Sequence, residues 1–309
     1  MSKTILVTGG AGFIGSHLVE KLLKLNYQVK ILDNFSTGKL ENLALFIEHP
    51  NLSIIRGSIT CFETVYQAMQ NTQYVFHQAA LVSVPLSIQQ PQQSFQNNIK
   101  GTFNIFEAAR CCHIEHIVFA SSAAVYAEST TPLQESMSTQ PASPYALEKL
   151  YAEQLAQLYQ QLYGISSTGL RYFNVYGERQ DPKSPYSGVI SIFLDKIRNQ
   201  QPITIYGDGQ QTRDFIYVKD VVQANISAME KSQNIYHTYN VATGHSITIQ
   251  KLVQILQKLT NSQEIEINTQ AARKGEIYHS YANVEYITDN LNWVPRWSIE
   301  KGLHQLIQY

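Results

Sequence analysis

The chain has 309 residues, of which 44% are apolar and 15% charged, and its formal net charge is −1. This composition is typical of a globular protein with one large α/β unit or two lobes. The near-neutral charge gives no basic field for a phosphate backbone, which argues against nucleic acid as a partner. The three cysteines, Cys61, Cys111 and Cys112, suit neither a disulfide framework nor a zinc site, so we expect reduced thiols and no bound metal.

The N-terminal segment has no features of a signal peptide, because its apolar run is short and ends at a glycine turn. No stretch approaches the roughly 18 apolar residues of a membrane span. We therefore expect a cytoplasmic enzyme without a membrane partner.

Short β-branched segments alternate with helical patterns in the first half of the chain. The predicted strands are 4–8, 28–33, 52–57, 74–79, 116–122 and 167–174, and the predicted helices are 13–25, 61–70, 94–112 and 145–163. This alternation predicts a parallel sheet with helices on both faces, as in a Rossmann-type doubly wound α/β fold.

The pattern becomes looser after residue 174, where prolines and glycines mark loops. Further helical patterns cover 187–199, 248–259 and 298–308. The segment 214–242 begins as a strand followed by a helix, and we expect it to return to the first sheet. The predicted organisation is a Rossmann domain over 1–174 with 214–242, and a smaller C-terminal α/β substrate domain within 175–309.

A glycine-rich turn, "VTGGAGFIGSH", follows the first predicted strand and opens a helix. Gly9, Gly12 and Gly15 allow a tight turn and a close approach to a pyrophosphate at the helix N-terminus. Asp33 ends the second predicted strand, where a carboxylate accepts hydrogen bonds from ribose hydroxyls and repels a 2′-phosphate. The pattern predicts NAD, in preference to NADP, as the cofactor.

The stretch "SPYALEK" places Tyr145 and Lys149 four residues apart, on one face of a predicted helix. An ammonium beside a phenol favours the phenolate, and half-ionisation near pH 7 needs about 4 kcal/mol relative to a free tyrosine. "ASSAAVY" lies 23 residues upstream, at the C-terminal end of a predicted strand, where ligands of parallel sheets bind. Ser122 and Tyr145 are therefore expected to contact the same substrate oxygen.

Together these motifs resemble the extended short-chain dehydrogenase/reductase superfamily, and within it the nucleotide-sugar 4-epimerases. The matching stretches include "TGGAGFIGSH", "HQAALVSVPLS", "SPYALEK", "LRYFNVYG", "IYGDGQQTRDFIYV" and "RKGEIYHSYAN", and they span nearly the whole chain. The highest similarity is to bacterial UDP-N-acetylglucosamine 4-epimerases.

The resemblance implies a role for each matching residue. Tyr145 is the base, Lys149 tunes it, and Ser122 assists. The implied NAD contacts are Gly9, Gly12, Phe13, Ile14, Gly15, Asp33, Asn34, Ser58, Ile59, Gln78, Ala79, Ala80, Asn98, Tyr145, Lys149 and Phe173. The implied contacts to a UDP-sugar are Ser83, Ser122, Asn174, Val189, Tyr206, Arg213, Arg273, Glu276 and Ser280.

Two positions need separate weighing. Ser58 replaces the aspartate that relatives use to hold the adenine amino group, so the adenine contact is expected to be weaker. His77 sits at a strand end near the expected cofactor, where it could act as a base or orient the loop. We favour the orienting role, because Tyr145 already supplies the base.

The resemblance implies 4-epimerisation of UDP-N-acetylglucosamine and UDP-N-acetylgalactosamine, and possibly of UDP-glucose and UDP-galactose, through a 4-keto intermediate. Dehydration is disfavoured, because Ala123 and Ala124 stand where dehydratases carry an acid pair. Action on a UDP-uronic acid, by epimerisation or decarboxylation, stays open as an alternative, as does a non-catalytic NAD-binding regulator.

Two further expectations concern specificity and assembly. Epimerases restricted to non-acetylated sugars often carry a tyrosine at the position of Ser280, and the smaller serine leaves space for an N-acetyl group. Relatives pair through helices equivalent to 98–112 and 145–163, so we expect a homodimer.

Overall fold

The computed structural model describes residues 3–182, 184, 188–231, 235–262, 264–272 and 277–309. The chain forms two compact units. The first unit comprises Met1–Ala127, Ser138–Arg171 and Val222–Tyr239, and the second comprises Glu128–Met137, Tyr172–Val221 and Asn240–Tyr309. Within the described residues, no helix is both long enough and apolar enough to cross a membrane.

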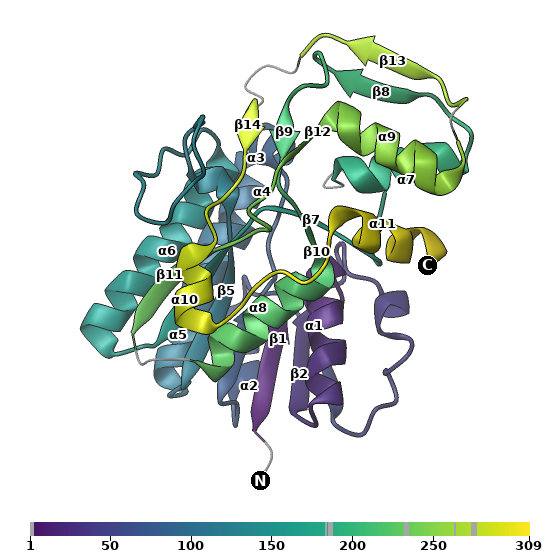
Figure 1. Cartoon of the computed structure of the whole chain (residues 1–309). Helices are drawn as coiled ribbons and strands as arrows, with labels where there is room; N and C mark the ends of the chain where they lie inside the picture. Colours follow the sequence, from purple (N-terminus) through teal and green to yellow (C-terminus); the bar gives the residue numbers. More distant parts are fainter. Residues whose placement is uncertain (1–2, 183, 185–187, 232–234, 263, 273–276) are drawn as a thin grey trace. The chain divides into compact units, whose positions relative to one another are not determined.

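A seven-stranded sheet forms the centre of the first unit, in the order β11-β6-β5-β4-β1-β2-β3 (Figure 1). Its strands are β1 Thr4–Thr8, β2 Gln28–Asp33, β3 Leu52–Arg56, β4 Tyr74–His77, β5 His116–Ser122, β6 Ser167–Tyr172 and β11 Tyr236–Val241. β1 pairs in parallel with both β2 and β4, so the chain reverses its direction of progression at β1. Ligands of such sheets bind at this switch point. The predicted Rossmann-type fold is confirmed.

Helices of the first unit alternate with these strands. They are α1 Phe13–Lys24, α2 Phe62–Met69, α3 Val84–Gln89, α4 Pro91–Phe95, a π-helical segment Gln96–Lys100, α5 Gly101–Cys111, α6 Pro144–Tyr163 and α8 Val218–Glu230, which enters the unit at Val222. Short 3₁₀ turns cover Leu40–Leu43 and Ala123–Val125.

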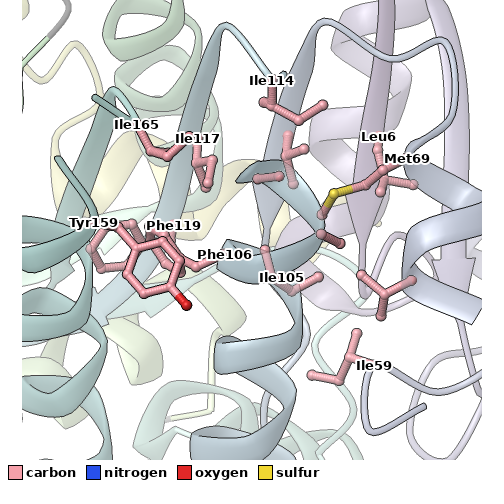
Figure 2. Close-up of a cluster of buried hydrophobic side chains, with 14 of the residues drawn as sticks. Leu6, Ile59, Met69, Ile105, Phe106, Ile114, Ile117, Phe119, Tyr159 and Ile165 are labelled. Carbon is pink, nitrogen blue, oxygen red and sulfur yellow. The ribbon is translucent and has the colours of Figure 1, made fainter. Parts of the chain in front are cut away.

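One face of the sheet packs against α2, α5 and α6. Figure 2 shows side chains of this layer, including Leu6 and Phe119 from strands and Met69, Phe106 and Tyr159 from helices. The Phe106 ring lies edge-on to the rings of Phe119 and Tyr159, with centroids 5.8 and 5.7 Å away. Such a packed layer holds the strand ends and α6 in a fixed relation.

The second unit contains three small sheets, β10-β7, β12-β9-β14 and β13-β8. Its strands are β7 Asn174–Tyr176, β8 Ile203–Tyr206, β9 Thr212–Arg213, β10 Phe215–Tyr217, β12 Ile247–Thr248, β13 Ile267–Gln270 and β14 His279–Ser280. Its helices are α7 Val189–Arg198, α9 Ile249–Thr260, α10 Glu285–Leu291 and α11 Ile299–Gln308.

The strand expected over 167–174 is in fact two strands. The Phe173 N–H bonds to the Val241 carbonyl, whereas the next N–H, of Asn174, bonds to the Asp214 carbonyl. The backbone therefore changes partner between these two residues, and β7 pairs with β10. The strand expected near residue 214 belongs to this small sheet, and within 214–242 it is β11 that joins the seven-stranded sheet.

Candidate active site

The glycine turn after β1 is built by close backbone approaches. Gly9 has a φ of +69°, and a Cβ on Gly15 would lie 2.1 Å from the Gly9 carbonyl oxygen. The Gly12 N–H donates to that same carbonyl over 3.0 Å. Glycine is required at Gly9 by its conformation and its close neighbours, and at Gly15 by the lack of space for a Cβ. The first turn of an α-helix has N–H groups without partners inside the helix, so the start of α1 after this turn favours an anion.

Asp33 lies beside this turn, at the carboxyl end of β2. Its side chain is buried and accepts hydrogen bonds from the N–H groups of Ala11, at 2.9 Å, and Phe35, at 2.8 Å. Each carboxylate oxygen can accept a further donor. The glycine cradle and this fixed carboxylate fit the pyrophosphate and adenosine ribose of NAD.

His77 ends β4 as a bridge between two hydroxyls. Its Nδ1 lies 2.8 Å from Thr8 Oγ1, and its Nε2 lies 3.2 Å from Thr102 Oγ1. Burial, together with the charge of Lys149, lowers the pKa of His77 to about 3. The imidazole is therefore neutral near pH 7, and its two contacts link the end of β4 to Thr8 and Thr102.

The loop after β4 is held by Asn98 of the π-helical segment. Asn98 Oδ1 accepts from the Leu81 N–H at 2.8 Å, and its Nδ2 donates to the Leu81 carbonyl at 2.9 Å. Gln78 Nε2 donates to Asn225 Oδ1, and the Ser83 hydroxyl caps α3 by accepting from the Leu86 N–H. Asn98 thus fixes the backbone of the segment in which several of the expected ligand contacts lie.

Helix α6 carries the two residues expected to handle protons. Ser143 caps it by accepting from the Ala146 N–H, Pro144 occupies its first position, and Gly164 ends it in the left-handed conformation. Lys149 Nζ lies 5.8 Å from the centroid of the Tyr145 ring and donates to the Ala120 carbonyl of β5 over 2.7 Å. Both side chains are buried.

Burial sets the proton affinity of both groups. It raises the pKa of Tyr145 to about 12, although a hydrogen bond from Ser122 acts in the opposite direction. It lowers the pKa of Lys149 to about 8. The Ser122–Tyr145 contact brings together the end of β5 and the start of α6, so the structure places the serine, tyrosine and lysine in one cluster.

The remaining expected cofactor residues of the first unit line the same sheet edge. Phe13 and Ile14 open α1, Ala79 lies against Gly9, and Ala80 follows it. Asn34 Oδ1 accepts from the Ser36 N–H. Ser58 Oγ lies 2.9 Å from Thr60 Oγ1, and the Ile59 carbonyl accepts from Asn104 Nδ2. Ser58 therefore presents a hydroxyl that is bonded within its own loop.

In the second unit, the backbone of Asp214 bonds to Asn174 and Ser280, and Arg213 precedes it in the chain; all three were expected at the UDP-sugar. The Asp214 N–H donates to the Ser280 carbonyl, and the Asp214 carbonyl accepts from both the N–H and the Nδ2 of Asn174. Ser280 is the parallel-strand partner of Arg213. The Asp214 carboxylate is fully buried and accepts from the N–H and hydroxyl of Thr243 and the N–H of Gly244.

The other expected contacts of this unit are dispersed. Val189 begins α7, and Tyr206 ends β8, where its carbonyl accepts from Gln211 Nε2. Phe173 is buried next to Asn174. Arg273 and Glu276 lie outside the described residues.

Sequence reasoning missed several residues that support the site. The Ser87 hydroxyl accepts from the Tyr145 N–H at 3.1 Å. Glu148 is buried beside Lys149, and the buried Asp214 makes the hydrogen bonds to Asn174 and Ser280 described above. Only the strand-end position of Asp214 is visible in the sequence, whereas the partners of Ser87 and Glu148 depend on tertiary contacts. Among the described residues, no group of three or more His, Cys, Asp or Glu side chains is arranged to hold a metal ion.

Residues 5–242 match the NAD dependent epimerase/dehydratase family. A putative UDP-glucose 4-epimerase of Methanocaldococcus jannaschii is 42% identical over 312 residues, covering 99% of this chain and 97% of that protein. A UDP-N-acetyl-alpha-D-glucosaminuronate decarboxylase of Bacillus cytotoxicus is 33% identical over 323 residues, covering 100% and 98%.

Among solved structures with the same fold, one contains a UDP-sugar and another contains NAD. UDP-N-acetylglucosamine 4-epimerase from Methanobrevibacter ruminantium M1, in complex with UDP-N-acetylmuramic acid, has a TM-score of 0.94 and 40% identity, covering 99% of this chain and 97% of that one. UDP-glucose 4-epimerase from Thermus thermophilus, in complex with NAD, has a TM-score of 0.90 and 34% identity, covering 99% and 98%. The glycine turn, Asp33 and the Tyr145–Lys149 pair agree with this match over the whole chain: the protein belongs to the NAD-dependent epimerase/dehydratase family and is an NAD-dependent enzyme.

Proposed function

We propose that this enzyme is a UDP-sugar 4-epimerase that interconverts UDP-N-acetylglucosamine and UDP-N-acetylgalactosamine. The observation that carries the proposal is the cluster of Ser122 with the buried Tyr145 and Lys149 at the sheet edge next to the glycine turn. A base at this edge can deprotonate a sugar hydroxyl, and the adjacent cofactor site can exchange a hydride with the same carbon.

Each residue of the cluster has a distinct role in this reaction. Tyr145, as the phenolate, takes the proton from O4 of the sugar, and the Ser122 hydroxyl donates to the same oxygen. NAD held by the glycine turn and Asp33 would supply the hydride acceptor and donor at C4, and Tyr145 would return the proton to O4 when the hydride comes back to the opposite face of the sugar. Lys149 supplies positive charge near the phenolate and is positioned by the Ala120 carbonyl. No net oxidation results, because the hydride returns to the carbon that lost it.

In this proposal one domain binds NAD and the other contributes most of the contacts to UDP. Residues 1–174, with the return segment in 214–242, hold NAD, and residues 175–309 contribute most contacts to UDP. Arg213 and Arg273 would grip the diphosphate, since guanidinium groups match its oxygens. Anchoring UDP leaves the 4-keto sugar free to turn between the two hydride transfers.

The test is direct. Purified protein is incubated with UDP-N-acetylglucosamine and NAD, and the products are separated by chromatography. Appearance of UDP-N-acetylgalactosamine, up to an equilibrium reached from either sugar, supports the proposal. No interconversion with saturating NAD would overturn it.

A second candidate is action on a UDP-uronic acid, which the similarity to the Bacillus cytotoxicus decarboxylase supports. Such a substrate would give CO₂ and a pentose nucleotide, or a 4-epimer that keeps its carboxylate. UDP-glucuronate and its N-acetylated analogue in the same assay distinguish these outcomes. Dehydration is disfavoured, because the turn Ala123–Val125 that follows Ser122 carries no acidic side chain.

Ser280 is the residue that we propose admits the N-acetyl group. Its side chain is half-buried, and its strand position next to Arg213 places it beside the expected diphosphate contact. Replacing Ser280 by tyrosine should lower kcat/KM for UDP-N-acetylglucosamine at least about tenfold and leave UDP-glucose turnover nearly unchanged, because added bulk acts against the larger substrate. Steady-state kinetics with both sugars make the measurement.

Ser280→Ala is the matched control and should keep both activities. Equal losses for the two sugars in Ser280→Tyr would contradict the size argument.

We also propose a homodimer formed through α5 and α6. Both helices expose apolar side chains, with Phe103 42%, Leu147 57%, Leu158 46% and Leu162 61% accessible. Exposed apolar side chains on two neighbouring helices favour an interaction surface, and two copies of one face build a symmetric pair. Leu162→Glu should shift the mass measured by light scattering toward the monomer, whereas Leu45→Glu, at an 86% exposed leucine elsewhere, should not. A monomeric wild-type protein would refute the dimer.

A further inference from the structure

Glu148 takes no part in the reaction described above, although it is buried at the catalytic pair. It lies three residues after Tyr145 and immediately before Lys149 on α6, and its side chain is 5% exposed. Its Oε2 accepts from Ser94 Oγ at 2.6 Å and from Asn98 Nδ2 at 2.6 Å. A buried carboxylate is costly unless its oxygens are hydrogen-bonded, so these contacts are a built feature of the fold.

Both contacts need an acceptor at Glu148, and both end on the same oxygen, Oε2. Asn98 uses its Oδ1 to accept from the Leu81 N–H, which turns its Nδ2 toward the Leu81 carbonyl and Glu148. An amide nitrogen can only donate, and Glu148 in its ionised form can only accept. Glu148 and the Leu81 backbone therefore favour the same orientation of the Asn98 amide, and that amide holds the loop that follows β4.

Asn98 lies in the π-helical segment Gln96–Lys100, a rare conformation that often occurs at functional sites. A second contact of the same kind links this layer to α6, because Ser87 of α3 accepts from the Tyr145 N–H. The start of α6 is thus tied to α3 at Tyr145, and to α4 and the π-helical segment at Glu148.

Glu148 also acts on the charge of the site. Burial is the main influence on Tyr145 and Lys149, but the Glu148 carboxylate raises the pKa of each. The other charged groups named on the neighbouring elements are paired, neutral or exposed. His77 on β4 is neutral, Glu153 on α6 pairs with Arg171, and Glu107 on α5 pairs with Arg110. Lys100, in the π-helical segment, is exposed.

We infer that Glu148 is a positioning residue of the catalytic centre, which holds the cofactor loop through Asn98 and sets the electrostatic balance of the Tyr145–Lys149 pair. The inference rests on the proposed function for its kinetic consequence. Its consequence for NAD binding does not depend on which sugar is turned over.

The test compares wild type with Glu148→Gln, which keeps the size of the side chain and removes its charge. Loss of the negative charge lowers the pKa of Tyr145, so the acidic limb of the plot of kcat against pH moves to lower pH. The same change lowers the pKa of Lys149, so the alkaline limb of the plot also moves to lower pH. We expect both limbs to shift by roughly one pH unit. The NAD dissociation constant should rise about tenfold, because the acceptor of the Asn98 hydrogen bond loses its charge.

Two further variants separate the causes. Glu148→Asp keeps the charge but withdraws it from Asn98, so NAD affinity should fall while both limbs stay near the wild-type pH. Glu107→Gln removes a half-buried carboxylate on α5 that accepts from Tyr159, and it should change neither property. If Glu148→Gln does not fold, Glu148→Asp decides, and wild-type NAD affinity in that variant would overturn the inference.

A lower melting temperature in Glu148→Gln, with unchanged limbs and NAD affinity, would show a purely structural role and overturn the inference. If the wild type converts no UDP-sugar, the proposed function fails separately. The ultraviolet titration of tyrosine in the NAD complex, with Tyr145→Phe as the blank, then replaces the pH profile. An unchanged Tyr145 midpoint in Glu148→Gln would again refute the electrostatic role.

Discussion

Replacing Tyr145 by phenylalanine should lower kcat for UDP-sugar epimerisation by about 10²–10⁴-fold, the usual contribution of a positioned acid–base group. The phenol ring is buried and fills the start of α6, so phenylalanine keeps the packing and removes only the hydroxyl. Steady-state kinetics with UDP-N-acetylglucosamine measure the loss, and fluorescence titration measures NAD affinity, which should stay close to that of wild type.

Tyr151→Phe is the matched control, because Tyr151 lies on the same helix and is not part of the cluster. It should retain wild-type turnover. Full activity in Tyr145→Phe would remove Tyr145 from the role of base and leave the reaction without its proton acceptor.

The proton affinity of Tyr145 explains why ligands must complete this site. With a pKa of about 12 set mainly by burial, the phenol needs about 7 kcal/mol of stabilisation to ionise near pH 7. Lys149 contributes part of this when it is charged, and its own pKa of about 8 keeps it protonated only below that pH. The positive nicotinamide ring and the substrate hydroxyl are the remaining sources. The active base is therefore expected to form in the complex with both ligands.

Much of the first unit follows from local sequence. The glycine-rich sequence predicts the tight turn after β1, because Gly9 and Gly15 occupy positions that only glycine fits. The spacing of Tyr145 and Lys149 predicts that they share a helix face, since side chains four residues apart are neighbours on a helix. The end of β2 at Asp33 likewise follows from the strand pattern.

The support of these residues does not follow from local sequence. Glu148 reaches Ser94 and Asn98, which lie 54 and 50 residues earlier in the chain. The change of partner between Phe173 and Asn174 depends on Val241 and Asp214, which come from distant segments. Such pairings are set by tertiary packing, and a single sequence carries no record of which buried polar groups meet.

Arg171→Met should produce the largest loss of stability that we predict. The Arg171 guanidinium in β6 makes a two-point contact with Glu153 of α6, at 2.9 and 2.7 Å, and donates to the Tyr126 hydroxyl at 2.7 Å. Glu153 also accepts from Ser121, the residue before Ser122. The charged side chains are only 6% and 5% exposed. Removing the arginine leaves a buried carboxylate without its cation, which costs about 3–5 kcal/mol of the free energy of unfolding.

The measurement is urea unfolding followed by tryptophan fluorescence and circular dichroism, with activity assayed in the native baseline. Arg110→Met, which breaks the exposed pair with Glu107, should cost at most about 1 kcal/mol. The double variant Arg171→Met, Glu153→Leu should recover part of the loss, because it removes both buried charges together. A cost for Arg171→Met no larger than that for Arg110→Met would mean that the buried pair contributes nothing to holding β5, β6 and α6 together. Ser122 would then owe its position to the Tyr145 contact and the apolar layer of α6 alone.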